Sequence, residues 1–314
     1  MERVVCGLCG ADDAVVRFPS TLPPGQSLAD WNAYRCTHNG YGVHPTIVQC
    51  RRCGLTYANP RQDGAQILET YIAVQDPLYV EEREGRVLTF EHHLRPLERL
   101  TGPPGGRMLL DVGAYTGVFV EIAARHGWDA WGVEPSRWAV AEARKRGLNV
   151  LQGTLDTAEL PAGAFDVVTM WDVIEHLTDP LETLRQAHRL LRPGGLLVVH
   201  TIDIGSPFAR LMGRRWPWLM EMHLYYFDRR TLRQMLEKAG FSVNDIRAQG
   251  RYLRLGYLMS RVAALLPWLG RPAERLVTRL RLRGLPVGVN LGDLCTVYAR
   301  KASLQESGAG SAAR

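Results

Sequence analysis

The chain has 314 residues, 46% of them hydrophobic, and a formal net charge of +6, which together support one substantial domain with a smaller appendage. No run of about 18 apolar residues is present, and the first ten residues include two cysteines but no apolar stretch. We therefore expect neither a membrane-spanning helix nor a signal peptide, and we expect a cytoplasmic protein.

The N-terminal 60 residues contain two Cys-x-x-Cys pairs, Cys6/Cys9 and Cys50/Cys53, each followed by a glycine. Without an export signal this spacing favours metal ligation over disulfides, although buried small apolar cysteines are an alternative. Four thiolates at two such turns suit tetrahedral Zn²⁺, and they leave no open position for catalysis. Residues 1–60 are predicted to form a zinc-binding module that the metal stabilises. Cys36 and Cys295 stand alone and are expected to pack in the core.

Residues 61–106 are predicted to form a mostly helical linker, since leucines at 88, 94, 97 and 100 recur at near-helical spacing. The segment 101–106, rich in glycine and proline, ends this helix. A main domain is then expected over 107–301, followed by a flexible tail over 302–314.

Strands and helices alternate along the main domain. Strands are predicted near 108–112, 130–134, 148–151, 165–170 and 196–201, and helices near 117–126, 136–146 and 181–191. The segment 192–195 reads as a helix stop and a turn into the fifth strand. A helix near 229–239, a strand over 241–248 and a last strand over 293–300 follow. This order predicts an α/β fold with a parallel sheet covered by helices on both faces.

The segment 109–117 carries the strongest functional signal, because an apolar strand ends at Asp111 and a glycine-punctuated turn then opens a helix. Such a turn brings bare backbone close to a ligand. The next strand ends at Glu134, whose carboxylate can accept hydrogen bonds from both ribose hydroxyls. We therefore predict a nucleoside-containing cofactor at the carboxyl edge of the sheet. A nicotinamide dinucleotide is the alternative, which Tyr115 within the turn disfavours.

Four stretches in order, 111–117, 132–136, 165–176 and 191–195, resemble motifs of the class I S-adenosylmethionine-dependent methyltransferases. The resemblance implies a Rossmann-like sheet of seven strands with a reversed C-terminal strand, which 241–248 and 293–300 can supply. Tyr115 departs from the family pattern D-x-G-x-G-x-G, where a glycine is usual.

The resemblance also implies which residues bind S-adenosylmethionine. They are Asp111, Gly113, Ala114, Tyr115 and Gly117 near the methionine moiety, Glu134 and Pro135 at the ribose, Leu155 and Asp156 by the adenine, and Met170, Trp171 and Asp172 beside the sulfonium. Transfer to a hydroxyl additionally needs a base. His223 and His176 are the catalytic candidates, whereas His200 is expected to be structural.

Nine arginines and one acid, Glu274, fall between Arg247 and Arg283, so this window carries +8 and the remainder −2. It lies in a basic and hydrophobic insert over about 247–290. The stripe of Ala273, Leu276, Val277 and Leu280 fits a solvated helix over the core. It also fits a surface for phospholipid head groups or for an anionic substrate.

The resemblance predicts methyl transfer to a small-molecule acceptor, most simply O-methylation of a sugar or glycan, or of a quinone or phenol. The family includes ubiquinone-biosynthesis O-methyltransferases, and sugar methyltransferases with a similar N-terminal zinc module. Two alternatives remain: an RNA methyltransferase whose knuckle arginines, Arg51 and Arg52, contact RNA, and a non-enzymatic adaptor with a vestigial cofactor fold. Since no basic track interleaved with aromatics is present, no nucleic acid partner is expected.

Overall fold

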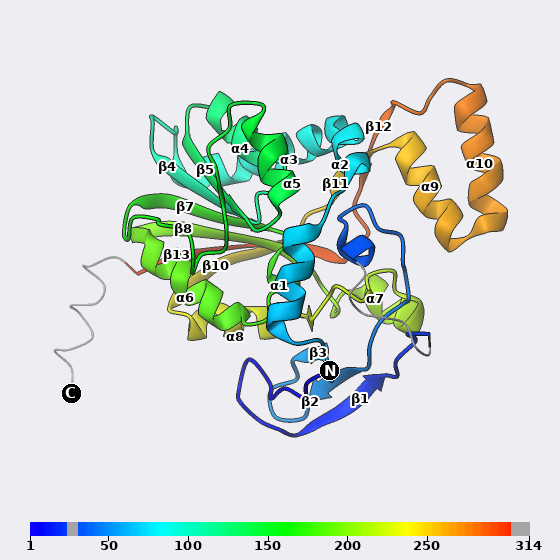
Figure 1. Cartoon of the computed structure of the whole chain (residues 1–314), viewed down its shortest axis with the longest axis horizontal. Coiled ribbons are helices and arrows are strands. Elements are labelled where there is room, and N and C mark those ends of the chain that lie inside the picture. The colour runs from blue at the N-terminus through cyan, green and yellow to red at the C-terminus, as the bar shows by residue number, and fades with distance from the viewer. Residues whose placement is uncertain (24–30, 303–314) are drawn as a thin grey trace.

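A central seven-stranded sheet organises the molecule (Figure 1), whose computed structural model describes residues 1–23 and 31–302. The strand order is β10-β13-β8-β7-β4-β5-β6, and β13 alone runs against its neighbours. The strands are β4 (Met108–Val112), β5 (Asp129–Glu134), β6 (Val150–Gln152), β7 (Phe165–Trp171), β8 (Leu191–Ile202), β10 (Phe241–Ala248) and β13 (Leu294–Lys301). This confirms the predicted sheet with its reversed strand. The predicted flexible tail lies outside the described residues from 303 onward.

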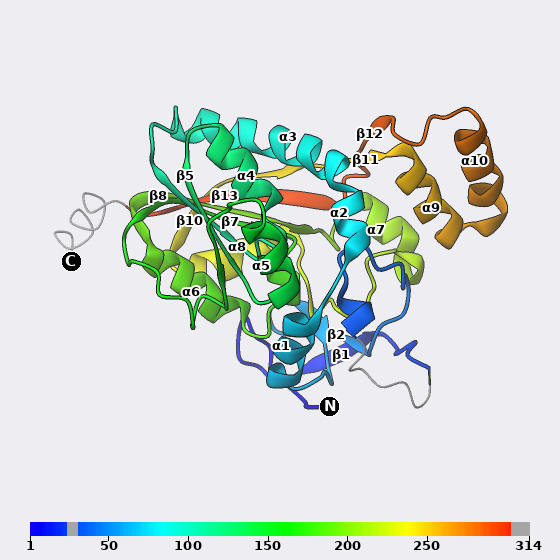
Figure 2. The ribbon, with the colours of Figure 1, turned by 45° about the horizontal axis from the view of Figure 1, so that its top comes forward.

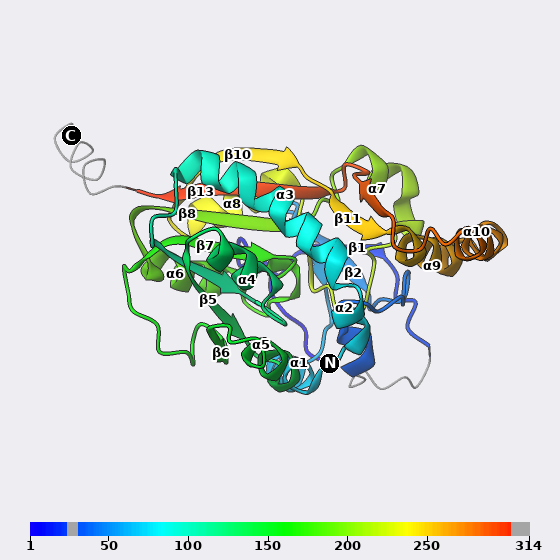
Figure 3. The ribbon, with the colours of Figure 1, turned by 90° about the horizontal axis from the view of Figure 1, so that it is seen from above.

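Helices cover both faces of the sheet, as expected for parallel strands that are apolar on both sides. On one face lie α3 (Arg83–Thr101), α4 (Val118–Arg125) and α5 (Arg137–Arg144), and on the other lie α6 (Pro180–Leu190) and α8 (Arg229–Lys238). Local signals set their starts: the Ser136 hydroxyl accepts a hydrogen bond from the Ala139 N–H at the first turn of α5. In Figure 3, α3 runs across the sheet toward β11.

The fifth strand begins earlier than predicted. β8 starts at Leu191, directly after α6, because Leu191 already pairs with Phe165 on β7. The register then shifts between Phe165 and Val167, where Gly194 adopts a positive φ of 74°. The predicted turn at 192–195 is therefore an irregular opening of the strand.

The N-terminal segment forms a separate antiparallel sheet of four strands, in the order β1-β2-β3-β9. Its strands are β1 (Ala14–Phe18), β2 (Ile47–Cys50), β3 (Thr56–Ala58) and β9 (Tyr225–Tyr226). The last strand comes from far along the chain and pairs Tyr57 with Tyr225. The cysteine-bearing segment is thus joined through its own sheet to residues that follow β8. Short helical elements complete this side: η1 (Trp31–Tyr34), α1 (Gly64–Ala73), α2 (Pro77–Glu81), η2 (Ile174–His176), α7 (Pro207–Met212) and η3 (Gly213–Arg215).

The basic insert forms a two-stranded ribbon and a helical hairpin that projects from the rest of the molecule (Figure 2). It comprises β11 (Arg251–Arg254), α9 (Leu255–Leu265), α10 (Pro267–Arg279) and β12 (Pro286–Val289). The predicted stripe does not pack on the core, since Leu276 and Leu280 remain 57% and 55% exposed and only Val277 is buried. Within the described residues, no helix combines the length and apolarity needed to cross a bilayer.

Candidate active site

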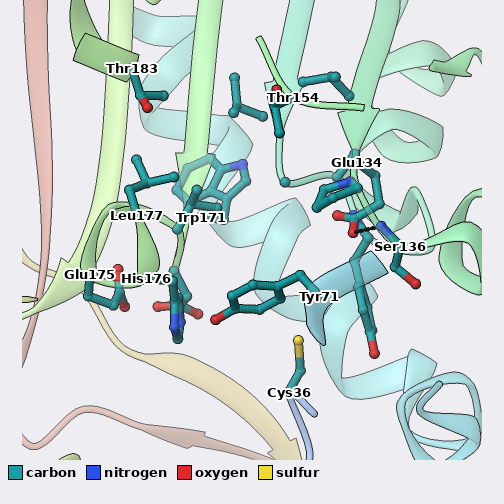
Figure 4. A pocket seen from close by; sticks show the side chains of 18 of the residues that line it. Cys36, Tyr71, Glu134, Ser136, Thr154, Trp171, Glu175, His176, Leu177 and Thr183 are labelled. Carbon is teal, nitrogen blue, oxygen red and sulfur yellow. Dashed lines mark hydrogen bonds between the residues drawn. The ribbon is translucent and has the colours of Figure 1, made fainter. Parts of the chain in front are cut away.

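A cavity of about 430 Å³ opens at the carboxyl ends of β4, β5 and β7. That volume is in the range of small-molecule and cofactor sites, and this edge of an open α/β sheet is where ligands bind. Figure 4 shows Glu134 on one side, Glu175 and His176 on the other, and Tyr71 between them. The loops after the strands build one wall, and segments from both ends of the chain build the other.

The turn after β4 folds back onto β5, and two of its residues adopt backbone conformations with positive φ, in the left-handed region of the Ramachandran plot. Gly113 has a φ of 69°, and a Cβ added there would lie 2.6 Å from Cγ2 of Val173. Tyr115 also has a positive φ, of 47°. Asp111 lies below this turn and accepts a hydrogen bond of 2.7 Å from the Thr169 hydroxyl. Burial raises the pKa of this carboxyl to about 8.

Glu134 is 5% exposed and accepts two backbone hydrogen bonds, from the N–H of Tyr115 at 2.9 Å and from that of Ser136 at 2.8 Å. Its carboxylate therefore fixes the loops after β4 and β5 relative to each other. Each oxygen retains a lone pair, and Glu134 lines the cavity. Burial raises its pKa to about 7, and the two N–H donors oppose that shift.

Most of the predicted cofactor residues line this cavity together: Asp111, Gly113, Ala114, Tyr115, Glu134, Pro135, Leu155, Asp156, Trp171 and Asp172. Gly117 and Met170 do not. Gly117 is the N-cap of α4, with a φ of 75°, and a Cβ there would lie 2.7 Å from Cδ1 of Leu148. Met170 is fully buried between β4 and β8. Both residues therefore pack behind the residues that line the cavity and do not line it themselves.

Both candidate catalytic histidines line the opposite side of the cavity. His176 and His223 lie with ring centroids 4.8 Å apart. The Nδ1 of His176 is 2.9 Å from the carbonyl oxygen of Met222, and the Nδ1 of His223 is 2.7 Å from that of Trp218. Each contact requires the proton on Nδ1, which leaves Nε2 with its lone pair. Burial lowers the pKa of both rings, for His223 to about 3.

A methyltransferase-domain family model matches residues 79–246, more than half of the chain. The chain is a class I S-adenosylmethionine-dependent methyltransferase. It is 32% identical over 160 residues to a Mycolicibacterium smegmatis protein named as a probable S-adenosylmethionine-dependent methyltransferase, covering 50% of this chain and 60% of that one. It is 30% identical over 174 residues to the ubiquinone biosynthesis O-methyltransferase of Aeromonas salmonicida, covering 49% and 73%.

A solved S-adenosylmethionine-dependent methyltransferase from Thermotoga maritima aligns at 23% identity with a TM-score of 0.48, covering 75% of this chain and 98% of that one. The methyltransferase spans between half and two thirds of the length of the first curated relatives that it matches, at 60% and 53%.

The methyltransferase also brings residues to the cavity that no sequence pattern singled out. Arg251, from the basic insert, lies with Nη2 3.2 Å from Oδ1 of Asp172, whose φ is 54°. Burial opposes ionisation of this carboxyl, but Arg251 and His200 lower its pKa below the usual range. His200 itself hydrogen-bonds the Thr296 hydroxyl through Nδ1 at 2.8 Å, which ties its ring to β13; its structural role stays a prediction.

Aromatic side chains from the N-terminal third form the remaining wall. Tyr34 and Tyr71 meet edge to face at 5.0 Å, and Tyr71 faces His176 at 6.1 Å. Cys36 lies on the same wall and is open to the cavity rather than packed in the core as expected, although burial still raises its thiol pKa to about 12. Cys295, by contrast, is 1% exposed within β13.

The four paired cysteines converge away from this cavity. Their sulfur atoms all lie within 4.8 Å of one another, and the Sγ–Sγ distances are 3.4 Å for Cys6–Cys53 and 3.6 Å for Cys9–Cys50. All four are free thiols. Four sulfurs so placed fit a tetrahedral metal site, and none of these cysteines lines the cavity.

Proposed function

We propose that this methyltransferase transfers the methyl group of S-adenosylmethionine to an oxygen of a small-molecule acceptor. One observation carries the proposal: Glu134 and the two imidazoles of His176 and His223 line one continuous cavity. A cofactor bound at Glu134 would extend toward His176 and His223, so an acceptor hydroxyl can lie between the cofactor and these two histidines. Relatives named ubiquinone biosynthesis O-methyltransferases support oxygen as the acceptor atom.

When bound, S-adenosylmethionine supplies an already electrophilic methyl group, so the protein contributes mainly alignment and exclusion of water. Glu134 would accept hydrogen bonds from the ribose hydroxyls, and the turn at Gly113 would accommodate the methionine moiety. The acceptor hydroxyl must lose its proton, and the unprotonated Nε2 atom of His176 or of His223 would accept that proton as a general base. Their Nδ1 contacts hold both rings in the orientation that this requires.

The acceptor is proposed to carry a ring, as a phenol, a quinol or a sugar does. Tyr71 and Trp218 line the cavity beside the histidines and offer apolar faces against which such a ring can pack. Labelled S-adenosylmethionine tested against panels of phenols, quinols and nucleotide sugars measures this directly. His223→Ala is expected to lower transfer about 10²–10⁴-fold, whereas His126→Ala, outside the cavity, should leave it unchanged. Equal loss in both variants, or transfer only to nitrogen acceptors, would contradict the proposal.

We propose that Cys6, Cys9, Cys50 and Cys53 hold one structural Zn²⁺. The sulfur spacing and the absence of disulfides support this, and four thiolates leave no site for substrate. Zinc analysis of the purified chain tests it, with one equivalent expected and none in a Cys50→Ser variant.

We propose that the projecting α9–α10 hairpin rests on an anionic membrane surface. Trp268 and Leu269 are 75% and 48% exposed at its tip, and Arg271, Arg275 and Arg279 follow them on α10 and are also exposed. Exposed apolar side chains beside arginines are typical of helices that lie in a lipid interface. Sedimentation with phosphatidylglycerol vesicles should deplete the protein, and Trp268→Ala should reduce that depletion. Leu211→Ala, on α7 where the side chain is 84% exposed, is the control; no sedimentation at low salt would refute the contact.

A further inference from the structure

Asp293 directly precedes β13 and carries a buried carboxylate that does not line the cavity. The residue is 3% exposed and forms no ion pair within residues 1–23 and 31–302. One of its oxygens, Oδ2, accepts two hydrogen bonds of 3.0 Å each, from the indole N–H groups of Trp216 and Trp218. Hydrogen bonds to an ionised acceptor are roughly twice as strong as those between neutral groups. The carboxylate therefore fixes the edges of both indoles.

The two tryptophans belong to a segment, 216–224, that contains neither a helix nor a strand. Because no ladder of backbone hydrogen bonds runs along this segment, its position depends on individual contacts to neighbouring elements. The bonds to Asp293 tie it to β13, which is paired on both sides within the central sheet. Asp293 is itself fixed, since its carbonyl oxygen accepts a hydrogen bond of 2.8 Å from the N–H of Asp203.

The same segment supplies the backbone groups that orient both cavity histidines. The carbonyl oxygen of Trp218 lies 2.7 Å from Nδ1 of His223, and that of Met222 lies 2.9 Å from Nδ1 of His176. Each carbonyl keeps a proton on Nδ1 and so leaves Nε2 with its lone pair. The position of segment 216–224 therefore determines the tautomer and the orientation of both rings.

Of the two indoles that Asp293 binds, Trp218 is the one that lines the cavity, whereas Trp216 is 1% exposed and lies in the core. The Trp218 ring lies 6.3 Å from the His223 ring between centroids, and the guanidinium of Arg251 lies over it at 5.4 Å. A rotation of this indole would displace both neighbours. The hydrogen bond to Oδ2 opposes that rotation, because it holds the edge of the ring.

We propose that Asp293 is a positioning residue for methyl transfer. Through Trp218 it holds segment 216–224 where the carbonyl groups of that segment keep Nδ1 of His176 and His223 protonated. The unprotonated Nε2 atoms then face the acceptor side of the cavity, where either can take the proton of the acceptor hydroxyl. This inference rests on the proposed transfer to oxygen and names the residue that maintains its candidate bases.

Two substitutions of Asp293 test the hydrogen bonds directly. Asp293→Asn keeps an oxygen that can accept both indole N–H groups, whereas Asp293→Leu has a similar size and no acceptor. Proton–nitrogen NMR correlation spectra of the imidazoles report which ring nitrogen is protonated, and they require no acceptor substrate. Wild type and Asp293→Asn should show protonated Nδ1 in His176 and His223, and Asp293→Leu should lose this tautomer in His223. Wild-type tautomers in a folded Asp293→Leu protein would overturn the proposal.

Two tryptophan variants form a matched pair, since each removes one hydrogen bond to the same oxygen of Asp293. Trp218→Phe should reproduce the tautomer change of Asp293→Leu, and it tests the proposal independently if Asp293→Leu does not fold. Trp216→Phe, in the core, should lower the melting temperature and keep the wild-type tautomers. Equal tautomer changes in both variants, or wild-type tautomers in a folded Trp218→Phe protein, would overturn the assigned route.

Methyl transfer separates this inference from the proposed function. With labelled S-adenosylmethionine and the best acceptor among the phenols, quinols and nucleotide sugars tested, Asp293→Leu should lower kcat about 10²-fold, as a displacement of about 1 Å can. Its Kd for S-adenosylhomocysteine should stay unchanged, and Asp293→Asn should restore most of the rate. Altered tautomers with an undiminished rate would refute the positioning role. Transfer confined to nitrogen acceptors, with the tautomers changed as expected, would refute O-methylation and leave the hold of Asp293 on the histidines standing.

Discussion

Replacing Glu134 with alanine probes the cofactor site at its most specific contact. The carboxylate already accepts hydrogen bonds from the N–H groups of Tyr115 and Ser136, so one lone pair on each oxygen remains for the ribose. A hydrogen bond to a charged group contributes about 1.5–3 kcal/mol. Because the ribose hydroxyls and the carboxylate exchange hydrogen bonds with water for the new ones, we expect a net loss of about 1–3 kcal/mol in cofactor binding, a roughly 5- to 150-fold rise in Kd.

Calorimetry with S-adenosylhomocysteine is the suitable assay, since this ligand keeps the ribose and lacks the sulfonium charge. A 2′-deoxy analogue should bind wild type more weakly than the parent ligand, yet bind Glu134→Ala about equally. Asp129→Ala, at the exposed start of the same strand, should behave as wild type. The variant also leaves two buried N–H groups without partners, so its fold must be checked by circular dichroism. A folded Glu134→Ala protein with unchanged affinity would refute the ribose contact.

Three further predictions concern the same framework. Because burial places the pKa of Glu134 near 7 and only the ionised form is a full acceptor, affinity for S-adenosylhomocysteine should rise by up to about tenfold per pH unit below pH 7 and level off above it; calorimetry should show this slope vanish in Glu134→Ala, and a slope of opposite sign would contradict the assignment. Gly113→Ala should lower the free energy of unfolding in urea by about 1–3 kcal/mol, since its φ is positive and the new Cβ meets Val173, whereas Gly64→Ala, with 3.4 Å to its nearest neighbour, should change little; equal effects would argue against strain. Cys50→Ser should abolish zinc binding, lower the melting temperature and reduce methyl transfer more than cofactor affinity, and a zinc-replete variant would exclude Cys50 as a ligand.

The order of elements in the main domain follows from the sequence because each strand and helix carries its own periodicity and its own stop signal. The alternating runs from 108 to 202 therefore predicted the sheet, and the acid near the end of each of its first two strands along the chain, Asp111 and Glu134, predicted the cofactor edge. Strand β9 could not be predicted in this way. It has two residues, Tyr225 and Tyr226, and its pairing partner lies about 170 positions earlier in the chain.

The acceptor side of the cavity was likewise beyond local patterns. Tyr71 belongs to a helix that was predicted only as part of a linker, and Arg251 was indistinguishable from eight other arginines in the insert. Arg251 reaches the cavity because β11 carries it there. Arg254, on the same strand, forms an ion pair of 2.7 Å with Glu82 and so holds β11 against the start of α3. Such long-range convergence is set by tertiary packing and leaves no signal in composition or spacing.

The four paired cysteines and the two cavity histidines, His176 and His223, are distant in sequence. A short series of backbone hydrogen bonds nevertheless connects them. Cys50 and Cys53 flank the turn between β2 and β3, and β3 pairs with β9 directly after His223. The N–H of Leu224 then donates to the carbonyl oxygen of Glu175 at 2.8 Å, while the N–H of Ala58 donates to that of Leu224. A metal ion that fixes the β2–β3 turn would therefore also fix the backbone next to His176 and His223, the two histidines on the proposed acceptor side of the cavity. Glu134 lies across the cavity on a different sheet, which is why loss of zinc should affect methyl transfer before it affects cofactor affinity.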